Sequence, residues 1–345
     1  MDISDVSGAA ARKRKPTRAI LGELCRALTL KFFRLCAAGG ALFSLLACFG
    51  SWAHLPDLAT HFRPQYFALG LISLISFAWL RRKWWMALAA LVLLFNLWFV
   101  APWYFPVKRA SANPPNLGAN FRVVLSNVLF SNRDFDAVLR LAREENPDVL
   151  VLQEMNRAWL GGAQPLERDY PHRMLATYFG LGGVLVLSRY PLTRAPVMDR
   201  PDWDVSGLAA RVDFHGRPVS LIALHPPSPE SAQGMHMRNR MLDVVAGAAR
   251  DLPSPLILIG DLNTTMWSPS YTRLESGSGL RNARRGFGLL PTWPTFLPVM
   301  YIPIDHCLVS PDIEVIQCRT GRRVGSDHLP LVVDLRIPGG VGGRR

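Results

Sequence analysis

Hydrophobic and polar positions alternate along residues 121–337 in short aliphatic runs that end in polar side chains, with helical stretches between them. The runs predict strands at residues 121–127, 147–154, 183–188, 208–214, 218–224, 255–263, 302–309, 313–318 and 329–335. Helical spacing is present at residues 134–145 and 235–250, and His215-Gly216 predicts a hairpin turn. At least eight strands with few helices predict an α/β fold in which two sheets pack face to face with helices outside.

The run at residues 255–263, Pro-Leu-Ile-Leu-Ile-Gly-Asp-Leu-Asn, is the stretch around which the chemistry is organised. In an extended strand alternate side chains share a face, so Asp261 and Asn263 would project together from the end of the strand. Placing a carboxylate and an amide there has a desolvation cost, which a metal, a phosphate or a hydrogen-bond partner must offset. An Asx-type turn that closes the strand is an equally good interpretation of the motif taken alone.

The N-terminal third has a different pattern, with apolar segments at residues 35–53, 66–80 and 84–105. The first contains 19 residues without a charge, which as a helix span about 30 Å of hydrocarbon. The third carries aromatic residues near its ends, as interfacial belts do, and the second is short for a span. We predict three transmembrane helices. A cleaved signal peptide fits less well, because the first apolar core is too long and two more segments follow.

The basic charge of the chain is concentrated beside these apolar segments. Residues 1–110 contain 14 Lys and Arg against 4 Asp and Glu, whereas residues 111–345 contain 25 against 22. The positive-inside rule predicts that the N-terminus and the Arg81-Arg82-Lys83 loop are cytoplasmic. Three crossings then place the C-terminal domain outside the cytoplasm. In a bacterium the chain would be a multi-pass protein of the inner membrane with this domain in the periplasm. The orientation inverts if residues 66–80 do not cross.

The chain is predicted to divide into a basic cytoplasmic N-terminus at residues 1–34, a membrane domain at 35–105, a Pro- and Asn-rich linker at 106–120, a globular domain at 121–337 and a tail at 338–345. Cys307 and Cys318 are the two cysteines of the globular domain. An oxidising compartment would permit a disulfide between them, but both are also typical of small core residues. The sequence has no Cys-x-x-Cys motif, which argues against a structural zinc.

The strand ends and the connections after them carry carboxylates, carboxamides and imidazoles: Asn127, Glu154, His225, Asp261, Asn263, Asp305, Asp327 and His328. Taken singly, each has an ordinary structural explanation as a turn residue, a cap, an exposed strand end or a loop histidine. Together they supply the ligands of a hard divalent cation and groups that transfer protons near neutral pH.

These residues lie in six motifs: Ser126-Asn127-Val128, Gln153-Glu154, His225-Pro226, Gly260-Asp261-Leu262-Asn263, Ile304-Asp305-His306 and Gly325-Ser326-Asp327-His328-Leu329-Pro330. In content and order the motifs resemble those of the endonuclease/exonuclease/phosphatase superfamily, which has the DNase I-like fold. The resemblance covers roughly residues 121–337. It implies a four-layer αββα sandwich and metal-dependent cleavage of phosphate esters. With three transmembrane helices before it, the chain resembles the membrane-anchored bacterial branch.

The resemblance implies a metal site. Glu154 would be the principal ligand of Mg²⁺ or Mn²⁺, with Asn127 beside it and Asp327 near the metal. A cation held there would polarise a phosphoryl oxygen. Apurinic-site endonucleases of the superfamily carry a carboxylate two residues after the first Asn, but Leu129 stands at that position here. That specificity is therefore not carried over to this chain.

The resemblance also implies the groups that perform the reaction. Asp261 would orient or deprotonate the attacking water, and Asn263 would hold the phosphate. Asp305 would orient His328. His328 and His225 would contact the scissile phosphate, and one of them would protonate the leaving oxygen, since oriented imidazoles transfer protons near neutral pH.

The sequence leaves the phosphate-ester substrate open among nucleic acid, phospholipid headgroups and small phosphoesters. The globular domain is close to charge balance, so it predicts no extended basic surface that follows a nucleic-acid backbone. Local patches would form at Arg281, Arg284 and Arg285 or at Arg319, Arg322 and Arg323, although solvated loops fit these clusters better. Thr292-Trp293-Pro294 would wall the pocket or pack beside it, and we favour packing.

A non-catalytic binding or scaffold module on the same fold is the alternative to an enzyme. The presence of every charged motif residue argues against it, because such a cluster destabilises a fold that has no use for it. The lipid bilayer is the partner that the apolar segments predict, and the sequence supports no inference about a protein partner.

Overall fold

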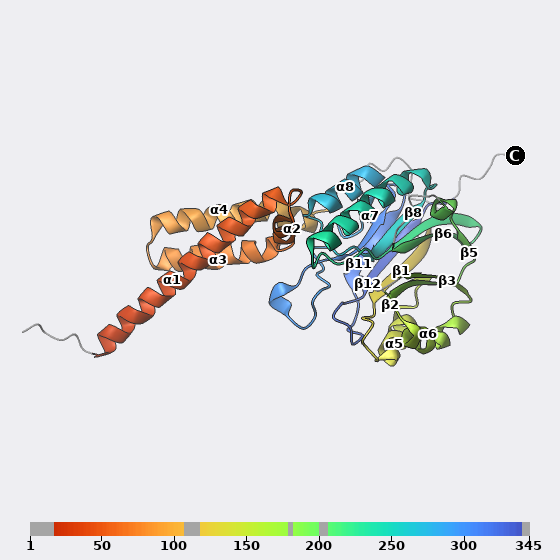
Figure 1. Cartoon of the computed structure of the whole chain (residues 1–345), viewed down its shortest axis with the longest axis horizontal. Coiled ribbons are helices and arrows are strands. Elements are labelled where there is room, and N and C mark those ends of the chain that lie inside the picture. The colour runs from red at the N-terminus through yellow and green to blue at the C-terminus, as the bar shows by residue number, and fades with distance from the viewer. Residues whose placement is uncertain (1–16, 107–117, 179–181, 200–205, 340–345) are drawn as a thin grey trace, which may run out of the picture.

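The computed structural model describes residues 17–106, 118–178, 182–199 and 206–339, which form a helical bundle and a globular domain (Figure 1). The bundle extends from one side of the globular domain, and the strands belong to the globular domain (Figure 1). Most of the predicted linker, residues 107–117, lies outside the described residues. So do residues 1–16 of the predicted cytoplasmic segment and residues 340–345 of the predicted tail.

The globular domain contains two six-stranded sheets. The first has the order β11-β12-β1-β2-β4-β3, formed by Glu314–Thr320, Leu331–Ile337, Ala119–Asn127, Val149–Met155, Gly182–Ser188 and His172–Tyr178. The second has the order β5-β6-β7-β8-β10-β9, formed by Leu192–Arg194, Gly207–Phe214, Arg217–Leu224, Leu256–Asp261, Asp305–Val309 and Arg281–Asn282.

Helices cover the outer face of each sheet, so the domain has four layers (Figure 1). Helices α5 (Phe135–Glu145) and α6 (Arg157–Gly162) pack on the first sheet, and α7 (Ala232–Asp251) and α8 (Pro269–Ser278) pack on the second. A third core fills the space between the sheets. The central strands are therefore buried on both faces, which explains their continuous aliphatic runs. The predicted two-sheet α/β fold is confirmed.

Strand direction brings the polar strand ends to one edge of the sandwich. β1 is parallel to β2, and β7 is parallel to β8, so the carboxyl ends of each pair lie together. β12 runs antiparallel to β1 and β10 antiparallel to β8, so these two strands begin at the same edge. Asp305, the first residue of β10, pairs with Asp261, the last residue of β8.

The bundle consists of α1 (Thr17–Leu46), α2 (His54–Thr60), α3 (Arg63–Trp79) and α4 (Lys83–Val100), with short 3₁₀ turns at Ala47–Phe49 and Ala101–Tyr104. The predicted first span at residues 35–53 is not one continuous helix. α1 begins before it and ends at Leu46, and Ala53 is already the N-cap of α2. α3 and α4 form a hairpin against which α1 packs (Figure 1).

Two segments of the bundle are long and apolar enough to cross a membrane: Glu23–Phe49, with 27 residues, and Lys83–Tyr104, with 22. In the most apolar 18-residue stretch of each segment, 22% is buried inside the structure, so most of the stretch faces outward. α3 has 17 residues and does not meet the same test. Two of the three predicted transmembrane segments therefore overlap helices that meet this test of length and composition.

The bundle contacts the globular domain through α2 and the ends of its neighbours. Asp57 on α2 accepts a hydrogen bond from Arg238 on α7 at 2.8 Å, and both side chains are buried. The indole Nε1 of Trp267 donates to the carbonyl of Phe99 at 2.9 Å. The guanidinium of Arg285 lies over the ring of Trp103, 4.5 Å from its centroid. These contacts fix the bundle beside the edge where the polar strand ends meet.

Candidate active site

Asn127 and Glu154 lie together at the ends of β1 and β2. The Nδ2 of Asn127 donates to Glu154 Oε1 at 2.9 Å, and the backbone N–H of Phe130 donates to Glu154 Oε2 at 2.9 Å. A register shift between Gln153 and Met155 leaves Glu154 in a bulge with a positive φ of 63°. Such a backbone is strained by about 1–3 kcal/mol, so the neighbouring contacts hold it in place.

Glycine is required opposite this bulge. A Cβ on Gly182 would lie 2.8 Å from the Cα of Glu154, and the φ of Gly182 is +68°. The first residue of β4 therefore permits the bulge, and the bulge turns the Glu154 side chain to the edge of the sheet.

His225, Asp261 and Asn263 lie at the ends of β7 and β8 in the second sheet. Asp261 Oδ2 accepts from Asn127 Nδ2 at 3.2 Å, which joins the polar edges of the two sheets. The Nδ1 of His225 lies 3.8 Å from Asp261 Oδ2, and its Nε2 lies 3.9 Å from Glu154 Oε1. The predicted convergence of Asn127, Glu154, His225 and Asp261 is therefore present.

Asn263 reaches the site by a route that the strand pattern does not predict. β8 ends at Asp261, and Asn263 has a φ of 49°, outside the extended region. Its backbone N–H donates to Asp261 Oδ1 at 2.9 Å, which is the Asx-type turn. Its Nδ2 donates to the carbonyl of Pro226 at 3.0 Å. The expectation that both side chains project from one extended strand is wrong, and the turn itself places the carboxamide beside the end of β7.

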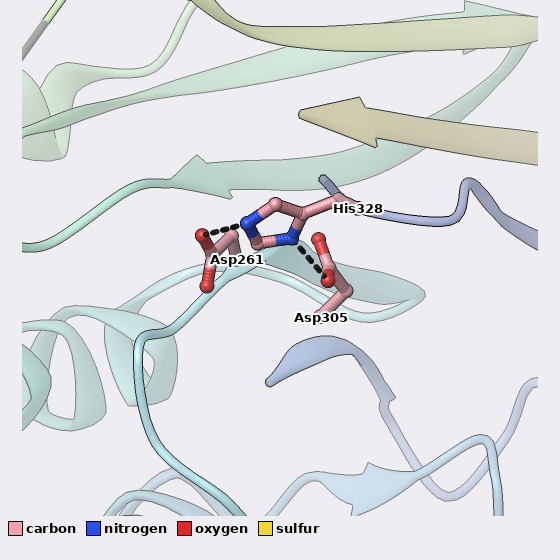
Figure 2. A group of neighbouring side chains, drawn as sticks. All are labelled: Asp261, Asp305 and His328. Carbon is pink, nitrogen blue, oxygen red and sulfur yellow. Dashed lines mark hydrogen bonds and ion pairs between the residues drawn. The ribbon is translucent and has the colours of Figure 1, made fainter. Parts of the chain in front are cut away.

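His328 lies between two carboxylates (Figure 2). Its Nδ1 donates to Asp305 Oδ2 at 2.9 Å, and its Nε2 lies 3.7 Å from Asp261 Oδ2. All three side chains are almost wholly buried. The structure thus brings the carboxylate of Asp305 within hydrogen-bonding distance of the His328 ring.

Burial and mutual charge set the protonation of this group. Burial raises the pKa of Asp261 to about 6; the neighbouring Asp305 adds to the rise and the charge of His328 opposes it. Burial alone would lower the pKa of His328, but the carboxylates of Asp305 and Asp261 raise it to about 10. Burial alone would raise the pKa of Asp305, but the charge and hydrogen bond of His328 hold it below its usual value. At neutral pH His328 is an imidazolium between carboxylates.

Asp327 is engaged differently from the other predicted metal ligands. Its Oδ2 accepts from the indole Nε1 of Trp293 at 3.0 Å, and its Oδ1 lies 3.4 Å from Ser326 Oγ. Among the described residues it makes no hydrogen bond to Asn127. The ring centroids of Trp293 and His328 are 6.5 Å apart. Trp293 therefore does more than the expected packing beside the pocket, because it donates a hydrogen bond to Asp327.

Gln153 is a positioning residue that motif reading did not assign. Its side chain is fully buried; Nε2 donates to the carbonyl of Leu224 at 2.8 Å, and Oε1 accepts from the backbone N–H of Asp261 at 2.9 Å. A Cβ on Gly260 would lie 1.8 Å from the same Leu224 oxygen, so glycine is needed where these strands approach. Gln153 thus clamps β2 of one sheet to β7 and β8 of the other. In the sequence, only its position next to Glu154 indicated that Gln153 lies at the site.

His306 and Arg284 support the strand that carries Asp305. His306 Nε2 contacts the carbonyl of Thr264 at 2.9 Å, and Arg284 donates to the carbonyl of Asp305 at 2.8 Å. Burial and the charge of Arg284 lower the pKa of His306 to about 3, so its ring is neutral. The motif histidine after Asp305 is therefore structural.

The two predicted arginine clusters differ in their exposure to solvent. Arg284 is fully buried, and Arg285 pairs with Glu275 at 3.2 Å. Arg319 pairs with Glu145 and Arg322 with Glu144, while Arg323 donates to the carbonyl of Thr295 at 2.6 Å. Arg322 and Arg323 are exposed and lie outside regular secondary structure, as the solvated-loop interpretation predicts, whereas Arg284 is not solvated. Cys307 and Cys318 are unpaired core thiols.

The donor chemistry at Glu154 fits a hard divalent cation. Its side chain is 18% exposed, whereas those of Asp261 and Asp305 are at most 2% exposed, so it is more open to solvent than these two carboxylates. Mg²⁺ is usually held by one or two carboxylates together with water and substrate oxygens. Asn127 and Glu154 lie together, but Asn127 directs its Nδ2 to the Glu154 carboxylate. Its side-chain oxygen is therefore not directed to the place where Glu154 would bind a cation.

Asp261, Asp305 and His328 also have ligand atoms within 4.8 Å of one another. An imidazole is a poor ligand for Mg²⁺, which prefers an all-oxygen environment. In this trio His328 is hydrogen-bonded directly to Asp305.

The model of the Endonuclease/Exonuclease/phosphatase family matches residues 124–328, more than half of the chain. The match begins after the helical bundle and ends at His328, so it contains all eight predicted site residues. No curated protein matches the chain by sequence at a significant level.

Solved structures share the fold of the globular domain. TDP2 of D. rerio, complexed with a single-strand DNA product, has a TM-score of 0.52 and 17% sequence identity, covering 63% of this chain and 99% of that one. An endonuclease/exonuclease/phosphatase from Bacteroides vulgatus has a TM-score of 0.51 and 15% identity, covering 64% and 100%. A protein of this family from Bacteroides thetaiotaomicron has a TM-score of 0.50 and 18% identity, covering 65% and 100%. At this identity the likeness shows the fold alone.

Proposed function

This chain belongs to the endonuclease/exonuclease/phosphatase family, and on that premise we propose that it is a membrane-anchored, divalent-metal-dependent phosphoesterase. The observation that carries the proposal is the imidazole of His328, held 2.9 Å from Asp305 and 3.7 Å from Asp261. Hydrogen bonds from Asn127 connect this trio to the carboxylate of Glu154. The groups that we assign to proton transfer and to the cation thus lie at one edge of the sandwich. Hydrolysis of a phosphodiester or phosphomonoester uses both kinds of group.

Asp261 is the group suited to take a proton from the attacking water. A carboxylate with a pKa near 6 is ionised at neutral pH and more basic than an ordinary aspartate. In the reaction the water oxygen bonds to phosphorus, the bond from phosphorus to the ester oxygen breaks, and Asp261 takes the proton of the water. Asn263, fixed by Asp261 and Pro226, supplies its amide to a phosphate oxygen.

The two histidines have separate tasks. His328 remains an imidazolium fixed by Asp305, so it stabilises the negative charge that accumulates on the phosphate oxygens. His225 is less constrained, because its buried Nδ1 has no hydrogen-bond partner among the described residues. We assign to it the donation of a proton to the leaving oxygen.

Glu154 would hold the divalent cation, with Asn127 beside it and Asp327 near it. When bound, Mg²⁺ or Mn²⁺ supplies positive charge that polarises a phosphoryl oxygen. The strained bulge at Glu154 and the hydrogen bond from Phe130 keep its carboxylate at the opening. Trp293 orients the carboxylate of Asp327.

A three-pass anchor in a bacterial inner membrane is supported by aromatic side chains at both ends of the bundle. The domain-end belt consists of the exposed residues Trp52, Trp98, Tyr104 and Phe105, and the distal belt consists of Trp79 and Trp84. α4 has 18 residues and rises about 27 Å between them, close to the hydrocarbon thickness of a bilayer. α3 packs beside α4 along this length, so a hairpin that inserts α4 in the bilayer would also insert α3. Arg81-Arg82-Lys83 at the distal end favours a cytoplasmic distal side and a periplasmic catalytic domain.

The test is hydrolysis by the purified full chain in detergent or vesicles. We expect turnover of bis-p-nitrophenyl phosphate, or of a substrate in a panel of DNA, RNA, phospholipid and inositol phosphates, with Mg²⁺ or Mn²⁺ and not with EDTA. Asp261→Asn should abolish it. Binding of these ligands without turnover, unchanged by Asp261→Asn, would instead support a non-catalytic module.

A further inference from the structure

A segment of exposed apolar side chains borders the site. We call residues 295–301 the rim loop; it contains the short helix η5 (Pro298–Met300). Phe296 and Val299 are each 71% exposed, and Leu297 and Met300 are exposed as well. Isolated exposed apolar residues are ordinary, but a contiguous group on one projecting loop marks an interaction surface.

The rim loop is fixed to the active site at its first residue. The backbone N–H of Thr295 donates to the carbonyl of Asp327 at 2.8 Å, and its Oγ1 donates to the carbonyl of Ser326 at 3.0 Å. Trp293, two residues earlier, donates to the carboxylate of Asp327. The apolar side chains of the loop therefore begin at the wall of the site that contains His328.

The other side of the rim loop is fixed to the helical bundle. Gln65, in the first turn of α3, donates from Nε2 to the carbonyls of Tyr301 at 3.0 Å and Val299 at 3.3 Å. Figure 1 shows the blue loop projecting from the globular domain toward the domain end of the bundle. The loop thus lies near the level of the domain-end belt, where aromatic residues anchor a helix at the surface of a bilayer.

We propose that the rim loop is embedded in the interfacial layer of the bilayer and that the site takes a phosphate ester carried on a lipid. This inference rests on the proposed phosphoesterase activity and membrane anchor. Phe296 and Val299 enter the boundary between headgroups and acyl chains, where their exposed surface is transferred from water. A lipid phosphate lies in that same layer, so its ester is presented to the wall formed by Trp293 and Asp327. A second copy of the chain docking on the loop is the competing occupant.

The position of the loop can be measured with a fluorophore in the full chain reconstituted in phosphatidylglycerol–phosphatidylethanolamine vesicles. Cys25, Cys36 and Cys48 are replaced by Ser, and the buried Cys307 and Cys318 remain. Phe296→Cys is labelled with an environment-sensitive dye. The control is Leu175→Cys, 41% exposed on the edge strand β3, which lies away from the bundle in Figure 1.

We expect the dye at 296 to be quenched by a nitroxide on the lipid tail and protected from aqueous iodide, and the dye at 175 to show the reverse. Equal iodide quenching at both positions overturns the inference. So does protection at 296 that disappears when the protein is diluted to one copy per vesicle, because that result identifies a second copy as the occupant.

The substrate part of the inference is tested by comparing two substrates. The double variant Phe296→Ser with Val299→Ser should lose at least tenfold in release of soluble phosphorus from the same vesicles, yet keep its turnover of bis-p-nitrophenyl phosphate. Leu175→Ser should change neither. If the wild type cleaves the soluble ester and releases no lipid phosphorus, the lipid inference is wrong and the phosphoesterase proposal stands. If it cleaves neither of these nor any other substrate of the panel named above, the proposed function itself fails.

Discussion

Asp57 and Arg238 form a buried ion pair 2.8 Å long that ties the helical bundle to the active-site loop. Asp57 belongs to α2 of the bundle, and Arg238 belongs to α7 of the globular domain. The second arm of the same guanidinium donates to the carbonyl of Asn263 at 3.0 Å. One arginine therefore connects the anchor to the residue that we assign to the phosphate.

Asp57→Asn is expected to destabilise the protein, because it leaves the charge of Arg238 buried without a counter-charge. Removing one partner of a buried pair destabilises by roughly 3–5 kcal/mol, which for a domain of this size lowers Tm by about 6–20 °C. Thermal unfolding of the purified chain measures it.

Asp243→Asn is the matched control for that variant. Asp243 pairs with Arg273 at 3.0 Å between α7 and α8, but both side chains are about half exposed. An exposed pair contributes no more than about 1 kcal/mol, so Tm should change little. Equal losses of Tm for the two variants would mean that the Asp57 pair has no special role in holding the bundle to the domain.

The contribution of Asp57 should depend on pH. Burial alone would raise the pKa of Asp57, but its contact with His61 and the charge of Arg238 lower it below 3.8. A carboxylate whose folded pKa is lowered stabilises the fold above its unfolded pKa and loses that contribution as pH falls through the folded value. The Tm difference between wild type and Asp57→Asn should thus be constant from pH 7 to about 5 and shrink below about pH 4. A difference that grows in acid would contradict this assignment.

The sequence was sufficient for the parts of the site that depend on strand periodicity. Asn127, Asp261 and Asp305 lie at the ends of aliphatic runs, and parallel pairing within each sheet brings such ends together. The burial of both sheet faces explains why these runs were readable as strands. The polar residues that interrupt them were therefore predictable candidates.

The other features depend on contacts between distant segments, which periodicity does not encode. Gln153 crosses from one sheet to the other, and Trp293 reaches Asp327 across 34 positions. Asn263 is placed by a turn whose motif favoured an extended strand equally well. The docking of α2 on α7 joins residues 181 positions apart, and α2 lies between the predicted spans at residues 35–53 and 66–80, where no helix was predicted.

Gln153→Ala should separate positioning from substrate contact. The variant removes the acceptor for the Asp261 N–H and the donor to Leu224, so Asp261 loses its fixed position. We expect kcat to fall by about 10–100-fold with KM within about twofold, since misplacing a reacting group slows the chemical step. The control is Gln317→Ala, an exposed glutamine on β11, which should leave both constants unchanged. Equal kinetics for the two variants would remove Gln153 from the positioning set.

Membrane orientation can be read with reporters fused after Arg345. Because Arg81-Arg82-Lys83 lies at the distal end of the bundle, three crossings place the C-terminus outside the cytoplasm. An alkaline phosphatase fusion should be active in a bacterial host and a cytoplasm-dependent fluorescent fusion dark. The opposite pair of results would show that α3 does not cross.

Glu154 and His328 should respond differently to metal, because one is assigned to the cation and the other to phosphate charge. Glu154→Gln keeps the shape of the side chain and weakens its affinity for a hard cation, so high Mg²⁺ should partly restore its activity. His328→Ala removes the imidazolium that Asp305 holds, and turnover should fall by about 10²–10⁴-fold with no rescue by metal.

The turnover of Asp305→Asn should lie between those of wild type and His328→Ala. Combining it with His328→Ala should lower activity little further, since residues that act as a unit are not additive. Mg²⁺ titrations of the four variants, with bis-p-nitrophenyl phosphate or whichever panel substrate is hydrolysed, measure all of these effects. Rescue of His328→Ala but not of Glu154→Gln by excess Mg²⁺ would reverse the two assignments while leaving the family membership intact.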